Sequence, residues 1–76
     1  MTTIELRLFA SLAACMPPNA QEYPIESGIR VADLLNQVGV SPSDAKMIFI
    51  NGKRADHNSN LYGKERVGIF PPVGGG

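Results

Sequence analysis

The strongest constraint on the fold of this chain is that only one of its segments has helical periodicity. Four apolar residues recur there at positions i, i+3, i+4 and i+7: Val31, Leu34, Leu35 and Val38. This is the spacing of the apolar face of an amphipathic helix of about three turns. Gly39 follows directly, and glycine often ends a helix because it readily adopts positive φ. We therefore expect one helix, with the rest of the core built from strands.

The remaining apolar residues follow the alternation of strands. In the first segment Ile4, Leu6 and Leu8 share one face, as every second residue of a strand does. In the last segment Val67 and Ile69 share one face in the same way. The predicted strands cover residues 3–9, 22–27, 46–51, 53–55 and 65–70.

The order strand, strand, helix, strand, short strand, strand predicts an α+β domain, with one helix across a mixed sheet of four or five strands. Pro24 favours an edge position for the second strand, because an edge tolerates a missing N–H. The Asn51-Gly52 pair predicts a tight hairpin. A last strand parallel to the first and beside it would put both chain ends in the centre of the sheet. The predicted core is Ile4, Leu6, Leu8, Ile25, Val31, Leu34, Leu35, Val38, Ile48, Ile50, Leu61, Val67 and Ile69.

Composition argues against several classes of function. The 76 residues include 7 basic and 7 acidic side chains, scattered along the chain, so we expect no nucleic-acid partner, which would call for a basic patch. The only cysteine is Cys15 and the only histidine is His57, so no metal site is expected. We expect Cys15 to be a small apolar residue in a helical turn and His57 to be solvent-exposed in a loop.

The sequence also lacks the patterns of a secreted, membrane-bound or independently catalytic protein. No signal peptide or apolar run of about 20 residues is visible, so we expect a soluble cytoplasmic protein with no membrane partner. No nucleophile–base pair, paired carboxylates or phosphate-binding loop is visible either. The expectation is a protein co-substrate with no bound cofactor rather than an enzyme acting alone.

Residues 70–76 read Phe-Pro-Pro-Val-Gly-Gly-Gly, which predicts a domain of residues 1–70 followed by a flexible tail of residues 71–76. Fully extended, this tail would reach roughly 20 Å, and its prolines favour an extended exit from the sheet. Glycine fits a channel too narrow for side chains, and the α-carboxylate of Gly76 is expected to be the reactive group. The residues expected to enter a partner's channel are Pro71, Pro72, Val73, Gly74 and Gly75. The alternative is a disordered end without a role.

Two aromatic residues are candidates for partner docking. By alternation, Phe9 and Phe70 both face away from the side that the helix covers. If the first and last strands are neighbours, the two rings form an exposed patch at the root of the tail, and partners commonly dock on such patches. The alternative for each is an ordinary core aromatic at the end of a strand.

The order of elements and the Gly-Gly end together resemble the ubiquitin-like β-grasp fold. Residues 67–76 resemble the tail of the small subunit of molybdopterin synthase, which typically has Phe-Pro-Pro-Val, a small residue and Gly-Gly. Further similar segments are Leu8-Phe9-Ala10, the helix start at residues 30–35 and the Ile50-Asn51-Gly52 hairpin. One difference is the turn Tyr62-Gly63-Lys64-Glu65, which is less acidic than the Asp-Gly-Asp-like turn common in that family.

The resemblance implies a sulfur carrier for molybdopterin or tungsten-pterin biosynthesis. An E1-like adenylyltransferase would use ATP and Mg to adenylate the carboxylate of Gly76. A sulfur donor such as a cysteine desulfurase or a rhodanese would then supply the sulfur of a C-terminal thiocarboxylate. The large subunit of molybdopterin synthase, or an analogous sulfur-accepting enzyme, would receive it.

Other functions within this fold remain open from the sequence. The same sulfur chemistry serves thiamine thiazole, cysteine and tRNA thiolation. A ubiquitin-like modifier would instead be joined to lysines through Gly76. A third alternative is an interaction module whose tail is inert.

Overall fold

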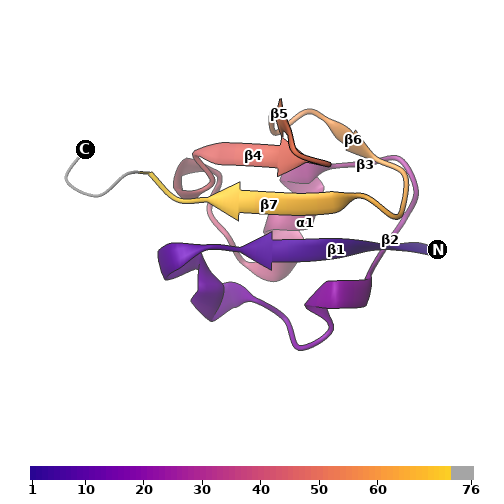
Figure 1. Cartoon of the computed structure of the whole chain (residues 1–76), viewed down its shortest axis with the longest axis horizontal. Helices are drawn as coiled ribbons and strands as arrows, with labels where there is room; N and C mark the ends of the chain where they lie inside the picture. Colours follow the sequence, from indigo (N-terminus) through magenta and orange to yellow (C-terminus); the bar gives the residue numbers. More distant parts are fainter. Residues whose placement is uncertain (73–76) are drawn as a thin grey trace.

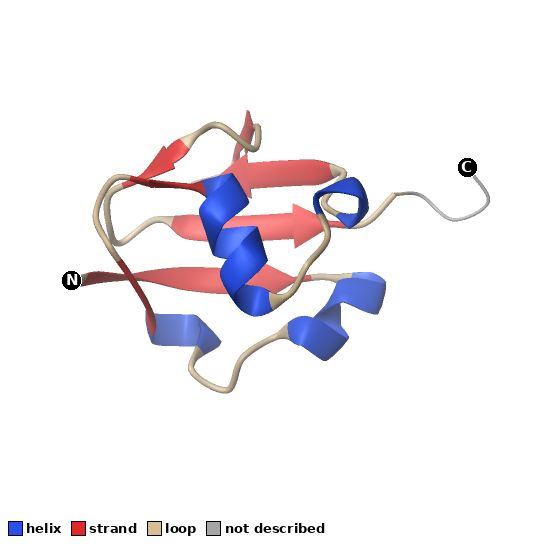
Figure 2. Cartoon of the chain, turned by 180° about the vertical axis from the view of Figure 1, so that it is seen from behind, coloured by secondary structure: helices blue, strands red, loops and turns tan. Residues whose placement is uncertain are grey.

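The computed structural model describes residues 1–72, in which one α-helix, α1 (Val31–Val38), crosses one face of a mixed five-stranded sheet (Figure 1, Figure 2). Across the sheet the strands are β2 (Tyr23–Ile25), β1 (Thr2–Leu8), β7 (Arg66–Phe70), β4 (Met47–Ile50) and β5 (Lys53–Ala55). A separate two-stranded sheet is formed by β3 (Ile29–Arg30) and β6 (Asn60–Leu61). Short 3-10 helices are η1 (Ala10–Cys15), η2 (Ala20–Glu22) and η3 (Pro42–Asp44).

The topology confirms the predicted α+β architecture, including the placement of the last strand beside the first. Strands β1 and β7 are parallel neighbours, with Leu6 opposite Val67 and Leu8 opposite Ile69. Strand β4 pairs antiparallel on the other side of β7, so β7 is the central strand. Pro24 lies in the edge strand β2, where its missing N–H breaks no second ladder.

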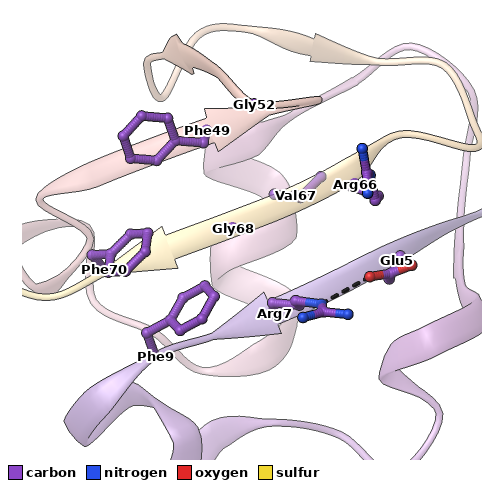
Figure 3. A pocket seen from close by; sticks show the side chains of 9 residues that line it. All are labelled: Glu5, Arg7, Phe9, Phe49, Gly52, Arg66, Val67, Gly68 and Phe70. Atoms are coloured by element: carbon purple, nitrogen blue, oxygen red, sulfur yellow. Dashed lines mark hydrogen bonds and ion pairs between the residues drawn. The ribbon is translucent and has the colours of Figure 1, made fainter.

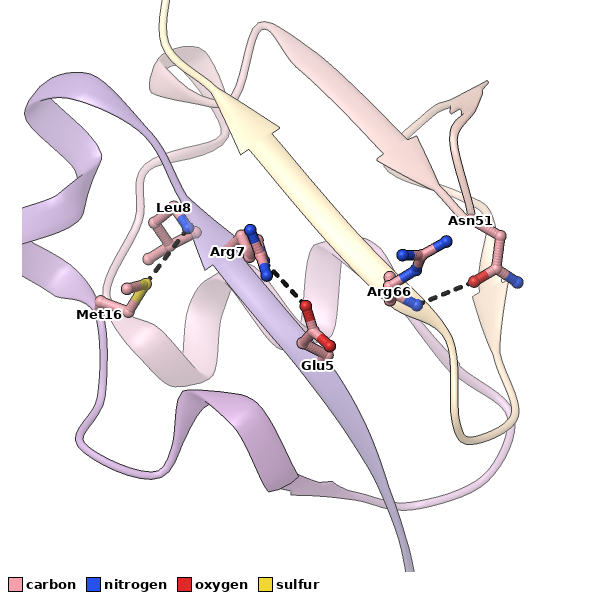
Figure 4. Close-up of polar contacts among 6 residues, drawn as sticks. All are labelled: Glu5, Arg7, Leu8, Met16, Asn51 and Arg66. Atoms are coloured by element: carbon pink, nitrogen blue, oxygen red, sulfur yellow. Dashed lines mark hydrogen bonds and ion pairs between the residues drawn. The ribbon is translucent and has the colours of Figure 1, made fainter.

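The predicted hairpin joins β4 to β5 and is also fixed to the central strand. Asn51 and Gly52 have φ values of 52° and 81°, as a tight turn with two left-handed residues requires. The Asn51 Oδ1 accepts the Arg66 backbone N–H at 2.9 Å (Figure 4), and the Asn51 backbone N–H donates to the Arg66 carbonyl at 2.9 Å. The start of β7 is therefore tied to the end of β4.

Helix α1 begins and ends where the periodicity predicts. At its start, the Arg30 backbone N–H donates to Asp33 Oδ2 at 3.2 Å. At its end, Gly39 has a φ of 81°, and the Val40 N–H donates to the Leu35 carbonyl at 2.9 Å, which provides a partner for one of the last helix carbonyls. Within residues 1–72, no helix has the length and apolar character needed to cross a membrane.

The core lies between α1 and the sheet and agrees largely with the prediction. Two predicted members, Val38 and Ile50, are only partly buried because they lie at the end of α1 and beside the hairpin turn. Four buried residues were not predicted: Leu12, Ala20, Val40 and Ala45. They lie in short 3-10 segments or loops, which have no long apolar period to reveal their buried side.

Two expectations for the loops need correction. Cys15 lies in a helical turn, as expected, but it is exposed rather than packed. His57 is half-buried rather than solvent-exposed: its Nε2 donates to the Ala45 carbonyl at 3.1 Å, and its own carbonyl accepts the Ala32 N–H at 2.9 Å. This histidine therefore ties its loop to the start of α1. The same loop contains the short strand β6, in which Leu61 is fully buried, as predicted.

Candidate functional site

The face of the sheet opposite α1 is not covered by the helix, and it is the face seen in Figure 1. Residues directly opposite one another on neighbouring strands share a face. The register sets Arg7 opposite Gly68 and Gly68 opposite Phe49, so these three positions form one row on the open face. Their chain neighbours Leu6 and Val67 are buried on the helix side. We call this surface the open face.

Three phenylalanines cluster on the open face at the end of β7, where the tail begins (Figure 3). The rings of Phe9 and Phe70 are stacked, with centroids 4.3 Å apart and an interplanar angle of 2°. Phe49 meets Phe70 edge to face at 5.8 Å and 86°. The Phe9 backbone N–H donates to the Ile69 carbonyl at 3.1 Å, which extends the pairing of β1 with β7 past Leu8. The structure thus brings Phe9 and Phe70 together and adds Phe49; all three are half-buried.

The alternation of residues 48–50 in the sequence is enough to place Phe49 on the open face. Phe49 lies between Ile48 and Ile50, which belong to the predicted core, so alternation places its ring on the opposite face. Its closeness to Phe70 depends on the pairing of β4 with β7. That pairing joins segments far apart in the chain and is not visible in local periodicity.

A shallow cavity of about 370 Å³ is centred on the open face. Gly68 forms its floor, since this residue has no side chain between Arg7 and Phe49 (Figure 3). A Cβ at Gly68 would lie 3.4 Å from the Phe9 ring atom Cε2, which is ordinary contact. At the far end, Arg7 Nε donates to Glu5 Oε2 at 2.8 Å (Figure 4). The cavity therefore has an aromatic end beside the tail and a charged end away from it.

The chain leaves the sheet directly after the aromatic cluster. The Lys46 N–H donates to the Phe70 carbonyl at 3.0 Å, so the end of β7 is held by the segment before β4. Pro71 is half-buried and Pro72 is exposed. The other predicted tail residues, Val73, Gly74, Gly75 and Gly76, lie outside the described residues. The position of the reactive carboxylate and the flexibility of the tail remain predictions.

The turn before β7 is held by an acidic side chain. Glu65 accepts the backbone N–H of Tyr62 at 2.8 Å and that of Gly63 at 2.7 Å. The Lys64 N–H donates to the Thr3 carbonyl at 2.6 Å, which attaches the turn to β1. The carboxylate of Glu65 therefore holds this turn by itself, although the turn is less acidic than an Asp-Gly-Asp-like one.

The side chains on the open face are mainly aromatic and cationic. Among the residues that the structure describes, no group of three or more His, Cys, Asp or Glu side chains lies close enough to hold a metal ion. In the same part of the chain, no polar or charged residue is buried. Aromatic and arginine side chains are enriched in protein–protein interfaces, so this surface is suited to recognition of another protein.

Residues 6–76 match the model of the ThiS family. SAMP1 from Haloferax volcanii has a similar structure, with a TM-score of 0.65 at 23% identity over 97% of this chain and 99% of that chain. A Pyrococcus furiosus protein assigned as molybdopterin converting factor, subunit 1, has a TM-score of 0.68 at 21% identity over 96% of this chain and 100% of that chain. No curated protein sequence matches the chain. Because the family model spans nearly the whole sequence, the chain belongs to the ThiS family, with the β-grasp fold of a ubiquitin-like sulfur carrier.

Proposed function

We propose that the chain carries sulfur as a thiocarboxylate on Gly76 and delivers it during synthesis of the molybdopterin (or tungsten-pterin) cofactor in the cytoplasm. The observation that supports this most strongly is the placement of the aromatic cluster. It lies where the central strand β7 passes into Pro71-Pro72, immediately before the glycine residues of the tail. A partner bound there would have the tail within reach of its active site.

The proposed chemistry begins with activation of a poor electrophile. The Gly76 carboxylate attacks the α-phosphate of ATP on an E1-like adenylyltransferase, pyrophosphate leaves, and Mg²⁺ neutralises the phosphate charge. A sulfur nucleophile then attacks the acyl carbon and AMP leaves. With hydrosulfide the product is the thiocarboxylate directly. With a persulfide donor, such as a cysteine desulfurase or a rhodanese, a thiol then cleaves the acyl disulfide. The catalytic groups belong to these partners.

This chain contributes positioning and access. Gly75 and Gly76 leave the reacting carbon unhindered, since neither has a side chain. Pro71 and Pro72 restrict φ, which reduces the entropy that is lost when the tail is ordered in a partner's channel. In this proposal Phe9, Phe49 and Phe70 form the docking site at the base of the tail.

The choice of acceptor rests on the tail and on the similar fold. Phe70-Pro71-Pro72-Val73 followed by glycines resembles the small subunit of molybdopterin synthase, and a protein of similar structure is assigned as a molybdopterin converting factor subunit. We therefore propose the large subunit of molybdopterin synthase as the sulfur-accepting partner. The thiocarboxylate sulfur would attack a carbon of the bound pterin precursor there and displace an oxygen leaving group. Water would then hydrolyse the resulting thioester, which leaves the sulfur on the pterin and Gly76 as a carboxylate.

The test is adenylation in vitro with the purified activating enzyme of the same organism. With ATP and Mg²⁺, the native chain should support exchange of labelled pyrophosphate into ATP. A control chain extended by one alanine after Gly76 should support little exchange, because the added methyl group crowds the reacting carbon. Equal exchange with both chains, or none with the native chain, would contradict the proposal.

A further inference from the structure

One hydrogen bond at the end of β1 has a sulfur acceptor. The backbone N–H of Leu8 donates to Sδ of Met16 at 3.4 Å (Figure 4). The N–H of the next residue, Phe9, points toward β7, so the Leu8 N–H points to the other side of β1. On that side β2 pairs only with residues 2–4. A thioether is a weak acceptor, and here it takes the place of a backbone carbonyl.

This bond holds the end of a strained segment, residues 9–16, which contains η1. Near its start, Ala10 has a φ of 53°, in the left-handed region that is costly for a residue with a Cβ. Such strain persists only where surrounding contacts hold the backbone in place. The start of the segment is held by the hydrogen bond from Phe9 to β7 and by the buried side chain of Leu12. Its end is held by the sulfur of Met16.

The sulfur of Met16 is accessible to small oxidants. The residue is 44% exposed, and it borders a cavity of about 260 Å³ along the edge of β1. The chain has two other methionines: Met47 is half-buried in β4, and Met1 is 91% exposed at the start of β1. Met16 thus combines exposure with a hydrogen bond that its own sulfur accepts.

An oxygen atom added to Sδ of Met16 does not fit between the sulfur and the Leu8 nitrogen. A hydrogen-bonded oxygen itself lies about 2.9 Å from the nitrogen, and the sulfur is only 3.4 Å away. The sulfoxide must therefore move back from the strand, or turn its oxygen to solvent and leave the N–H without this partner. In both cases the sulfur no longer holds the segment 9–16, and the strain at Ala10 favours its release.

We propose that Met16 is a site of reversible oxidation that releases η1 from the end of β1. A hydroperoxide transfers one oxygen atom to Sδ: the O–O bond breaks, an S–O bond forms, the sulfur is oxidised by two electrons, and the peroxide leaves as an alcohol or as water. Methionine sulfoxide reductases with a thiol reductant restore the thioether, and the products are water and a disulfide. The thioether then accepts the Leu8 N–H again.

The release reaches the base of the tail through one residue. Phe9 follows Leu8 directly, its N–H is bonded to β7, and its ring stacks on Phe70 with centroids 4.3 Å apart. A shift of the backbone at residues 8–10 therefore disturbs the aromatic stack. The oxidation and its structural effect require neither the tail nor sulfur transfer, so this proposal goes beyond the proposed function and is tested separately from it.

The experiment treats three proteins with hydrogen peroxide, all carrying Cys15→Ser so that the thiol does not react. They are the otherwise native chain, Met16→Leu and Ala10→Gly. Leucine has nearly the volume of methionine, so the fold should tolerate it, but it cannot be oxidised. Peptide mass mapping gives the extent of oxidation at each methionine. Hydrogen exchange measured by NMR reports on the Leu8 amide, and melting curves report on the whole domain.

In the otherwise native chain, oxidation of Met16 should accelerate exchange of the Leu8 amide about tenfold. It should lower the melting temperature by roughly 4–8 °C, as the loss of about one net hydrogen bond does in a domain of this size. Met16→Leu should show neither change relative to its own untreated form, although its Met1 is oxidised equally. Reduction by the two methionine sulfoxide reductases, one for each epimer, with dithiothreitol should restore the starting values.

Three results would overturn the proposal. The first is unchanged exchange and melting in a chain that is oxidised at Met16. The second is an equal change in Met16→Leu, which would assign the effect to another residue. The third is a Met16 that stays unoxidised under conditions that fully oxidise Met1.

The variant Ala10→Gly tests the strain. Glycine adopts positive φ freely, so the segment 9–16 gains little by leaving the sheet. Oxidation of this variant should lower the melting temperature by roughly half as much as in the otherwise native chain. An equal loss in both proteins would refute a release driven by strain.

The NMR shifts of the Phe70 ring protons test whether the change reaches the tail. The stacked ring of Phe9 displaces these shifts, so they should move when Met16 is oxidised and stay in place in peroxide-treated Met16→Leu. Unchanged shifts in the oxidised chain would refute the transmission. No activating enzyme enters these measurements, so their failure leaves the proposed function intact, and a failure of adenylation leaves this proposal intact.

Discussion

The stacked rings of Phe9 and Phe70 should be energetically coupled, and a double-mutant cycle measures that coupling. The rings are 4.3 Å apart and parallel within 2°, and an aromatic pair of this kind contributes about 0.5–1.5 kcal/mol beyond the area that it buries. Because both rings are half-buried, each single Phe→Ala change should cost roughly half of the 3–5 kcal/mol typical of a fully buried phenylalanine. Phe70→Ala should cost more than Phe9→Ala, since Phe70 also contacts Phe49.

The free energy of unfolding of the native chain, both single variants and the double variant would be measured by urea denaturation. The double variant should lose about 1 kcal/mol less than the sum of the single variants. As a control, Phe9→Ala combined with Tyr62→Ala should be additive within about 0.5 kcal/mol, because Tyr62 is 63% exposed and lies before the opposite end of β7. A coupling between Phe9 and Phe70 no larger than the control would refute the stacking argument.

Two further predictions concern the turn that precedes β7. Gly63→Ala should lower the free energy of unfolding by about 2–5 kcal/mol, because Gly63 has a φ of +134° and a Cβ there would overlap the Thr2 side chain. The control Gly28→Ala, where φ is also positive but the space is open, should lower it by only about 1–2 kcal/mol. Equal losses for the two variants in urea denaturation would contradict the clash at Gly63. Glu65→Gln should lower the free energy of unfolding by about 1–2 kcal/mol, because two charge-assisted hydrogen bonds from backbone N–H groups are weakened or lost. The control Glu26→Gln, at a residue with no side-chain hydrogen bond within residues 1–72, should change the thermal midpoint little. A similar shift of the midpoint for both variants would show that Glu65 does not hold the turn.

Much of the fold was predictable because its elements have strong local patterns. The helix required only the 3.6-residue spacing that ends at Gly39, and the hairpin required only the backbone preferences of Asn51-Gly52. The order of elements made parallel pairing of the first and last strands the natural closure of the sheet. These features depend on neighbours in sequence, which periodicity and turn chemistry describe well.

The features that sequence reasoning missed depend on contacts between distant segments. Alternation puts the Phe49 ring on the open face, but its meeting with Phe70 requires the register of β4 against β7. His57 looks like a loop residue until the fold brings Ala45 within 3.1 Å of its ring. The role of Glu65, in contrast, could have been predicted from local sequence. A carboxylate two residues after a glycine can accept hydrogen bonds from the backbone N–H groups of the turn that contains them.

The central claim is that Gly76 carries sulfur, and its most direct test is the intact mass of the protein isolated from its own host. The account predicts a species heavier by the difference between one sulfur and one oxygen atom, with fragmentation placing the change on Gly76. Alkylation with iodoacetamide should label this C-terminal sulfur in a variant in which Cys15 is replaced by serine. A Gly76 found only as a carboxylate or joined to lysines of other proteins, under conditions where the activating enzyme and the sulfur donor are active, would contradict the account.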